Sequence, residues 1–309
     1  MKKGFVLLLL FCLFGGVGCK KEVATLSILL PDGIPAIALG GLFEDSNLDV
    51  KIVSGPDLIT SELVQENYDC IVAPITAGAK LYLNEATSYR LAAILTTGNT
   101  YIVSRSQDIL TSLASLEGQT IAAYGENNTP DIILKAALAA AEVNASIVYE
   151  NSVNDVVSAR FLGANPAPYI LCAEPVLSTL EIKMELAINT LDLQAELAPQ
   201  FEFIPQAGIF IRELTPTIQS FLNDVGENVL KLNTTPSTYV DKLLALDPVA
   251  YPTFSKLGSN ILISAIPRSN IEYIRSTTIQ ENLNLYFNLL NAYQVQLLGG
   301  KIPDEDFVI

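Results

Sequence analysis

The stretch YDCIVAP (residues 68–74) is an apolar run of strand length that ends at a proline, and a helical pattern follows at once over residues 75–84. A short apolar run bounded by turn residues is typical of a strand buried on both faces. Earlier in the chain we predict a strand at residues 25–30, a helix at 35–42, a strand at 49–53 and a helix at 56–67. Strands that alternate with helices indicate a mainly parallel α/β sheet.

The alternation continues beyond this strand and then begins again. Strands are predicted at residues 90–95 and 101–104, and a second block of strands and helices covers residues 104–203. In that block Leu134 and Leu138 lie on one face of a helix predicted over residues 130–141. A returning strand is predicted at residues 203–211, and helices are predicted at 215–232, 236–246, 251–257 and 270–298.

The two blocks predict two lobes. We assign residues 25–100 plus 207–309 to lobe 1 and residues 101–206 to lobe 2, so that the chain crosses twice between them. A chain of 309 residues has the length of about two ordinary domains. The predicted fold class is therefore α/β, with two βα lobes, two crossing segments and a cleft between the lobes.

The composition excludes several kinds of chemistry. Hydrophobic residues make up 50% of the chain, which is enough for a packed core. Histidine is absent from the sequence, and this excludes Ser-His-Asp triads, Cys-His dyads and histidine-ligated zinc or haem. The net charge of −15 argues against a nucleic-acid partner, because phosphate binding needs clustered Lys and Arg. We predict no catalytic residue, no metal site and no cofactor.

The N-terminus has the pattern of a secretory signal peptide. A short basic stretch precedes an apolar run at residues 5–14, which is too short to span a membrane, and small residues lead to Cys19. A cysteine in this context resembles a bacterial lipobox, at which it is lipidated and becomes the new N-terminus. We predict a signal peptide at residues 1–18, lipidation of Cys19 and a tether at residues 19–24, so that lipid alone anchors an extracytoplasmic protein. An ordinary signal peptide with an incidental cysteine is the alternative.

Two further cysteines, Cys70 and Cys172, lie in apolar runs of strand character. Buried and unreactive thiols are the favoured interpretation. A disulfide between them is the alternative, and the sequence leaves it open.

Several short segments, in their order and spacing, resemble one known family. They are LPDGIP (residues 30–35), YDCIVAP (68–74), LEGQTIA (116–122), AEPV (173–176) and GGKIPD (299–304). Together they resemble extracellular substrate-binding proteins of ABC importers, in the NMT1/THI5-like family of nitrate, sulfonate, taurine and thiamine-precursor binding proteins. The resemblance extends over residues 26–307.

The resemblance implies a periplasmic-binding-protein-like fold of type II, whose lobes close around a ligand by hinge bending. It also implies a lipid-anchored protein, not an enzyme, that captures a small molecule in the interlobe cleft and delivers it to an ABC permease and its ATPase. One alternative is an enzyme on the same fold, although the related thiamine-precursor synthases need a histidine that this chain lacks. The other is a receptor lipoprotein without a transport role.

Candidate ligand contacts follow from a general rule for open α/β sheets, in which ligands bind beyond the carboxyl ends of strands. In lobe 1 and the crossings the rule selects Asp32, Gly33, Ile34, Thr76, Thr97, Asn99 and Gln206. Asp32 and Thr76 would alternatively cap the helices that follow them. The polar groups at the first crossing either satisfy local backbone or face the cleft, and we favour the cleft.

In lobe 2 the most informative segment is the loop at residues 124–130. It offers Tyr124, which would stack on a planar ligand, together with Asn127, Asn128 and Thr129. Thr129 and Pro130 predict an N-cap and a first helical residue, and free N–H groups at such a helix end bind anionic or carbonyl oxygens. The alternative is a solvated loop beside a capped helix. Glu174 ends a strand, and it either faces the cleft or serves as a hinge-stabilising partner.

The chemistry of the ligand is constrained by charge. Basic residues are scarce in these loops, whereas Asp32, Glu126 and Glu174 disfavour an anion. Asp131 also disfavours an anion at the helix start unless its side chain points away. We therefore favour a neutral polar or heteroaromatic small molecule over an anion.

Overall fold

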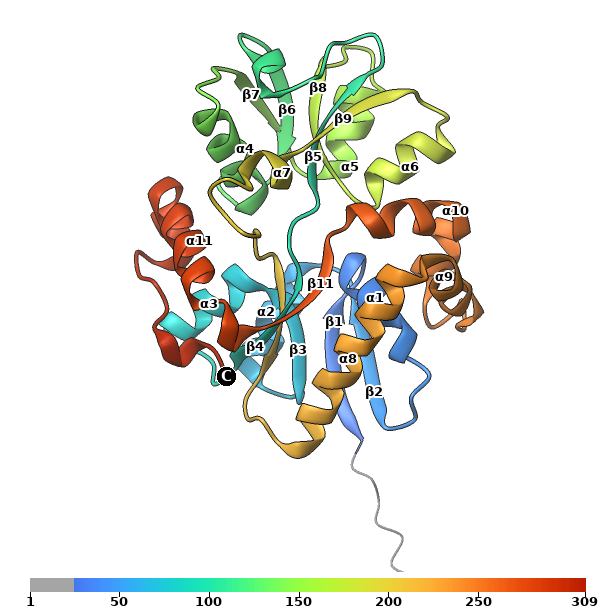
Figure 1. The fold of residues 1–309 in the computed structure, drawn as a ribbon, viewed down its shortest axis with the longest axis vertical. Coiled ribbons are helices and arrows are strands. Elements are labelled where there is room, and N and C mark those ends of the chain that lie inside the picture. Colours follow the sequence, from blue (N-terminus) through green and yellow to red (C-terminus); the bar gives the residue numbers. More distant parts are fainter. Residues whose placement is uncertain (1–24) are drawn as a thin grey trace, which may run out of the picture.

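The computed structural model describes residues 25–309. The predicted signal peptide, Cys19 and the tether lie outside the described residues. The described chain forms two lobes arranged along the long axis of the molecule, each built around one sheet (Figure 1). Within residues 25–309, no helix combines the length and the apolar character that crossing a membrane requires.

Lobe 1 contains a six-stranded sheet in the order β11-β4-β10-β3-β1-β2. Its strands are β1 (Leu26–Pro31), β2 (Leu48–Val53), β3 (Cys70–Pro74), β4 (Arg90–Thr96), β10 (Ala207–Ile211) and β11 (Ile271–Arg275). β1 pairs in parallel with β2 and β3, whereas β10 runs antiparallel between β3 and β4. The segment YDCIVAP thus contains an inner strand, β3, and its residues from Cys70 to Ala73 are fully buried.

Helices cover both faces of this sheet. They are α1 (Ile34–Leu39), α2 (Pro56–Gln65), α3 (Ile75–Leu83), α8 (Pro216–Thr234), α9 (Pro236–Ala245), α10 (Pro252–Arg268), α11 (Gln280–Tyr293) and α12 (Val295–Leu298). Successive residues of a strand point to opposite faces, so β1 contributes to two cores. Leu29 packs in the core that includes α2 and α3, and Ile28 and Leu30 pack in the core that includes α1 and α8.

Lobe 2 contains a five-stranded sheet in the order β7-β6-β8-β5-β9. Its strands are β5 (Thr100–Arg105), β6 (Thr120–Tyr124), β7 (Ser146–Glu150), β8 (Tyr169–Ala173) and β9 (Ile188–Asp192). Its helices are α4 (Thr129–Ala140), α5 (Val153–Asp155) with a π-helical continuation (Val156–Phe161), α6 (Val176–Lys183) and α7 (Leu193–Leu197). Helices from lobe 1 reach this lobe on both sides, because α10 packs against α6 and α11 packs against α4 (Figure 1).

Two of the predicted helices near the C-terminus were wrong in extent. The first part of the helix predicted at residues 270–298 is instead the strand β11. Asn270 has a left-handed backbone, and the pairing of β11 with β4 outweighs the local helix propensity. The predicted helix at residues 251–257 continues to the end of α10. Gly258, with φ 76° and ψ 170°, kinks α10 where the sequence suggested an end.

The predicted state of the two internal cysteines is confirmed in its favoured form. Cys70 in β3 and Cys172 in β8 are buried and free, and they belong to different sheets. Burial raises the pKa of both thiols, that of Cys172 to about 12, so the reactive thiolate is scarce at neutral pH.

We therefore expect neither thiol to react with a maleimide in native protein spanning residues 20–309, and both to react in urea. Intact-mass spectrometry counts the adducts, and C70A and C172A should each remove one adduct from the unfolded sample. Rapid modification of the native protein would contradict the burial of these strands.

Candidate functional site

A cavity of about 400 Å³ opens between the two lobes. Pro31 and Pro74 bring the ends of β1 and β3 to its wall from lobe 1, and Tyr124 and Ala173 bring the ends of β6 and β8 from lobe 2. The carboxyl edges of both sheets therefore face one space, which is where ligands of open α/β folds bind.

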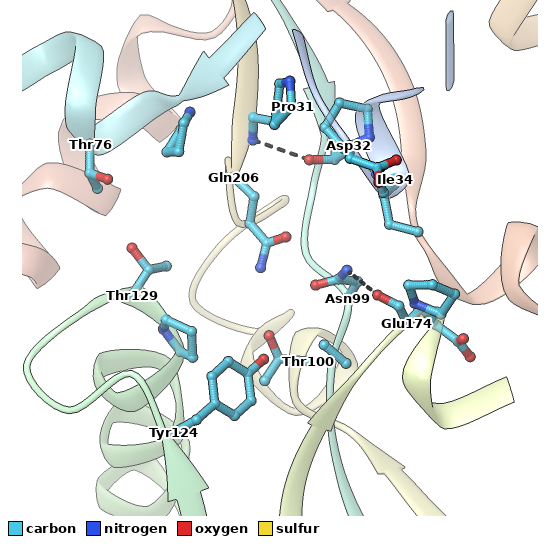
Figure 2. Close-up of a pocket in the computed structure, with 18 residues that line it drawn as sticks. Pro31, Asp32, Ile34, Thr76, Asn99, Thr100, Tyr124, Thr129, Glu174 and Gln206 are labelled. Atoms are coloured by element: carbon cyan, nitrogen blue, oxygen red, sulfur yellow. Dashed lines mark hydrogen bonds between the residues drawn. The ribbon is translucent and has the colours of Figure 1, made fainter. Parts of the chain in front are cut away.

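Most of the predicted site residues line this cavity (Figure 2). They are Asp32, Gly33, Ile34, Thr76, Asn99 and Gln206 from lobe 1 and the crossings, and Tyr124, Thr129 and Glu174 from lobe 2. Residues more than a hundred positions apart in sequence meet here because the loop after each parallel strand lies at the same edge of its sheet.

Three predicted residues do not line the cavity. Thr97 is fully buried, and both its N–H and its hydroxyl donate to the carbonyl of Asn270, at 3.0 and 3.3 Å. It therefore satisfies a backbone group that is close in space but distant in sequence, and it does not face the cleft. Asn127 and Asn128 lie on the exposed side of their loop, where Asn128 Nδ2 donates to the carbonyl of Glu126 at 3.2 Å.

The start of α4 differs from the prediction. Asn128 is the N-cap and Thr129 is already helical, and no side chain of the N-cap accepts a hydrogen bond. Asp131 instead ties the preceding loop to the helix, because its buried carboxylate accepts from the N–H of Asn127 at 2.8 Å. The same carboxylate accepts from Lys135 Nζ at 2.8 Å and from the Tyr149 hydroxyl at 2.6 Å. Asp131 does not line the cavity, so it does not repel a ligand at the helix start.

Asp32 lines the cavity, but both of its carboxylate oxygens have partners. Oδ1 accepts from the N–H of Gly33 at 2.8 Å, and Oδ2 accepts from the hydroxyl of Thr253 at 2.6 Å. The predicted alternative of a side-chain cap on α1 is wrong, because Gly33 is the N-cap and has no side-chain hydrogen bond. Asp32 thus ties the first loop to the beginning of α10.

Glu174 also uses its carboxylate within the protein. Oε1 lies 2.7 Å from Nε of Arg268 as an ion pair, and Oε2 accepts from the N–H of Ser178 at 3.2 Å. Burial raises the pKa of Glu174, and the nearby Arg268 opposes that rise. The carboxylate is thus engaged as the hinge-side ion partner that was one of its two interpretations. Its backbone carbonyl accepts from Asn99 Nδ2 at 3.3 Å (Figure 2).

Both acidic residues of the cavity wall are therefore held by one helix, α10. Thr253 at its beginning binds Asp32 in lobe 1, and Arg268 at its end pairs with Glu174 in lobe 2. Arg268 also donates to Glu181 at 2.6 Å and to Ser178 at 2.8 Å, and its carbonyl accepts from the Tyr101 hydroxyl at 2.7 Å. This network links the two walls in the conformation that the structure describes.

The polar groups left free toward the cavity carry no charge. They are the side-chain amide of Gln206 and the hydroxyls of Thr76, Thr100 and Tyr124, none of which bonds to another residue in the described part of the chain. Burial raises the pKa of Tyr124, so its hydroxyl is protonated at neutral pH. No Lys or Arg lines the cavity, and within residues 25–309 no three Cys, Asp or Glu side chains converge as metal ligands.

Some residues of the cavity wall were not predicted from the sequence. The missed residues include Pro31, Pro35, Pro74, Pro130, Pro175 and Thr100. Each proline lies at a strand end or a helix start, which is where ligands are expected to bind. These prolines were interpreted only as turn signals, although they also form apolar surface of the cavity. Arg268 was not predicted as a partner of the site, because the predicted helix ended at residue 257 and the part of α10 that carries Arg268 was not predicted.

The fold defines the class of protein. Two α/β lobes with an interlobe cavity form a periplasmic-binding-protein-like fold. The strand order of lobe 1 includes β2-β1-β3-β10-β4. Strand β10 follows lobe 2 in the sequence but lies inside the sheet of lobe 1, as the predicted type II architecture requires. The sequence model of the family described as NMT1/THI5 like matches residues 36–175, which confirms the resemblance stated from the short segments.

Solved structures share this fold. The chain is similar to an ABC transporter structure from Parabacteroides distasonis, with TM-score 0.77 and 20% identity over 93% of this chain and 99% of that one. It is similar to the periplasmic aliphatic sulphonate binding protein SsuA from Escherichia coli, with TM-score 0.70 and 13% identity over 93% and 92%. A third is the zinc-bound ligand binding component of an ABC-type import system from Staphylococcus aureus, with TM-score 0.63 and 14% identity over 92% and 96%. No curated protein matches the sequence.

Proposed function

We propose that this protein is the solute-binding component of an ABC import system. The observation that carries the proposal is the cavity between the lobes, whose walls come from the carboxyl edges of both sheets. The similar structures described as a sulphonate binding protein and as a component of an import system support the same role. The protein captures a small molecule and delivers it to a permease and its ATPase, tethered outside the cytoplasm by lipid on Cys19.

The lobes in this proposal are residues 25–100 plus 207–309 and residues 101–206. The crossings between them lead into β5 and β10, and both border the cavity through Asn99, Thr100 and Gln206. Because the two lobes are connected through these crossings, a small rotation about them would open or close the cavity.

The cavity favours a neutral polar or heteroaromatic solute over an anion. An anion would find no cationic side chain on the wall, and Asp32 and Glu174 add negative charge nearby. The free amide and hydroxyl groups bind neutral donors and acceptors well, and burial of an unpaired charge is costly. The same inventory supports a binding protein over an enzyme, because both acids of the wall are engaged by protein groups, Asp32 by Gly33 and Thr253 and Glu174 by Arg268 and Ser178.

The test is a solute screen on residues 20–309. Native mass spectrometry of the purified protein comes first, followed by thermal shift against vitamins, nucleobases, amino acids, sulfonates and anions. A solute at 100 times its dissociation constant stabilises the folded state by about 2.7 kcal/mol. We expect a neutral polar or heteroaromatic class to give this shift and taurine and nitrate to give none; tight taurine binding would refute the ligand class.

A blocked cavity provides the control. Thr76→Trp places a bulky ring at the wall and should abolish the shift, whereas Thr217→Trp, in a surface groove at α8, should preserve it. If no solute stabilises the wild type and no mass is retained, the proposed function is wrong. Permease and ATPase genes beside this gene would separate an importer component from a receptor without transport.

A further inference from the structure

The side chain of Gln206 projects into the middle of the interlobe cavity (Figure 2). Its backbone is fixed on both sides, because its N–H donates to the carbonyl of Thr96 at 3.0 Å and its own carbonyl accepts from the N–H of Ile75 at 2.9 Å. The next residue is fixed as well, since the N–H of Ala207 donates to Thr96 Oγ1 at 3.1 Å. The fold therefore positions the amide but leaves its donor and its acceptor without a partner among residues 25–309.

The charged side chains of the cavity wall are two carboxylates, and both already have protein partners. Asp32 is occupied by Gly33 and Thr253, and Glu174 is paired with Arg268. Such an amide gains most from a neutral partner, because an anion brought into this space would lose its hydration without meeting an opposite charge.

The walls around the amide are largely apolar. Pro31, Pro74 and Pro130, which carry no N–H donor, line the cavity, and the aromatic ring of Tyr124 lies on the lobe 2 side (Figure 2). Walls of this kind pack against the faces of a planar ligand and leave its edge to be recognised by hydrogen bonds.

We propose that Gln206 selects the ligand by pairing with a neutral planar edge that carries an acceptor beside a donor, as a carboxamide or lactam does. A glutamine amide offers one donor and one acceptor side by side, and it pairs in the same bidentate way with the edge of adenine. The inference rests on the proposed function, since it assigns the selecting group of the same cavity.

The experiment uses benzamide, N,N-dimethylbenzamide, benzoate and benzamidine, which share one ring and differ in that edge. Calorimetry at millimolar concentration should show benzamide bound at least about tenfold more tightly than the dimethyl compound, which lacks the donor. Q206L should weaken benzamide by about tenfold to hundredfold. Q206E presents two acceptors and a negative charge, so it should prefer benzamidinium, whose two N–H groups donate.

A matched control and a direct readout complete the design. Gln219→Leu removes a surface amide of α8 that donates to Asn223, and it should change none of these affinities. In ¹H–¹⁵N spectra, the side-chain amide signals that disappear in Q206L should shift when benzamide is added to the wild type and stay in place with the dimethyl compound. This readout needs no variant to bind ligand.

The possible results separate the two proposals. The swap of preference in Q206E together with the shifted amide signals supports the role of Gln206. If benzamide and its dimethyl analogue bind equally, or if solutes of the wider screen bind while the Gln206 signals stay in place, the inference is overturned and the solute-binding function stands. If neither the screen nor this series binds, the proposed function itself is overturned.

Discussion

Replacement of Arg268 by methionine should lower the free energy of unfolding by about 3–5 kcal/mol, because it leaves a buried carboxylate without its counter-ion. The side chain of Glu174 is 0% exposed, and Arg268 Nε lies 2.7 Å from it. After the substitution only the N–H of Ser178 would remain as its partner. Urea denaturation, followed by a separate probe in each lobe, measures the loss.

Two controls isolate the charge. R268M combined with E174Q should recover most of the loss, since the remaining amide is neutral. K231M breaks the exposed ion pair between Lys231 and Glu227, whose side chains are 67% and 73% exposed, respectively. It should lower the free energy of unfolding by at most about 1 kcal/mol.

The loss in R268M should also depend on pH. Without Arg268, burial holds the pKa of Glu174 above its unfolded value, so the folded state takes up the proton first as pH falls. The destabilisation is therefore absent below the unfolded pKa, near 4.3, and grows as pH rises through the folded pKa. A loss that is independent of pH and unchanged in the double variant would mean that Arg268 acts by packing alone.

Asp131→Ala should be the second strongest substitution, with a loss of about 3 kcal/mol in the free energy of unfolding. Its buried carboxylate accepts three hydrogen bonds, from Asn127, Lys135 and Tyr149, and bonds to a charged group contribute more than neutral ones. Lys135 is 36% exposed and can turn toward water, which limits the loss.

The matched control is Asp57→Ala. Asp57 also lies in the first turn of a helix, but it is exposed, so only its interaction with the helix dipole is lost, about 0.3–1 kcal/mol. Chemical denaturation of both variants gives the comparison. Equal losses would show that the network around Asp131 adds nothing to the charge at a helix start.

Much of lobe 1 was predictable because its inner strands are short apolar runs. The residues from Cys70 to Ala73 are buried on both faces, and the short length of the run and the proline that ends it favour a strand over a buried helix. The cavity was predictable for a geometric reason, since the loops after parallel strands meet at one edge. Asp32, Thr76, Tyr124 and Gln206 all line it accordingly.

The parts that escaped prediction depend on partners distant in sequence. β11 is an edge strand whose pairing partner β4 lies far earlier in the chain, so its local pattern does not reveal it. Thr97 and Asn99 are close neighbours in one crossing, but only Thr97 donates to the carbonyl of Asn270, whereas Asn99 lines the cavity. The ion pair of Glu174 with Arg268 could not be predicted either, because hydrophobic periodicity does not indicate which charged residues form a pair.

The position of β10 also constrains the order in which the chain can fold. Lobe 2 is one continuous piece of chain, whereas the sheet of lobe 1 has a gap between β3 and β4 until β10 arrives after it. Until then both strands expose unpaired edges, which are prone to aggregate. We expect lobe 2 to form early from contacts close in sequence, and completion of lobe 1 to be the slow step at which chaperones protect the chain.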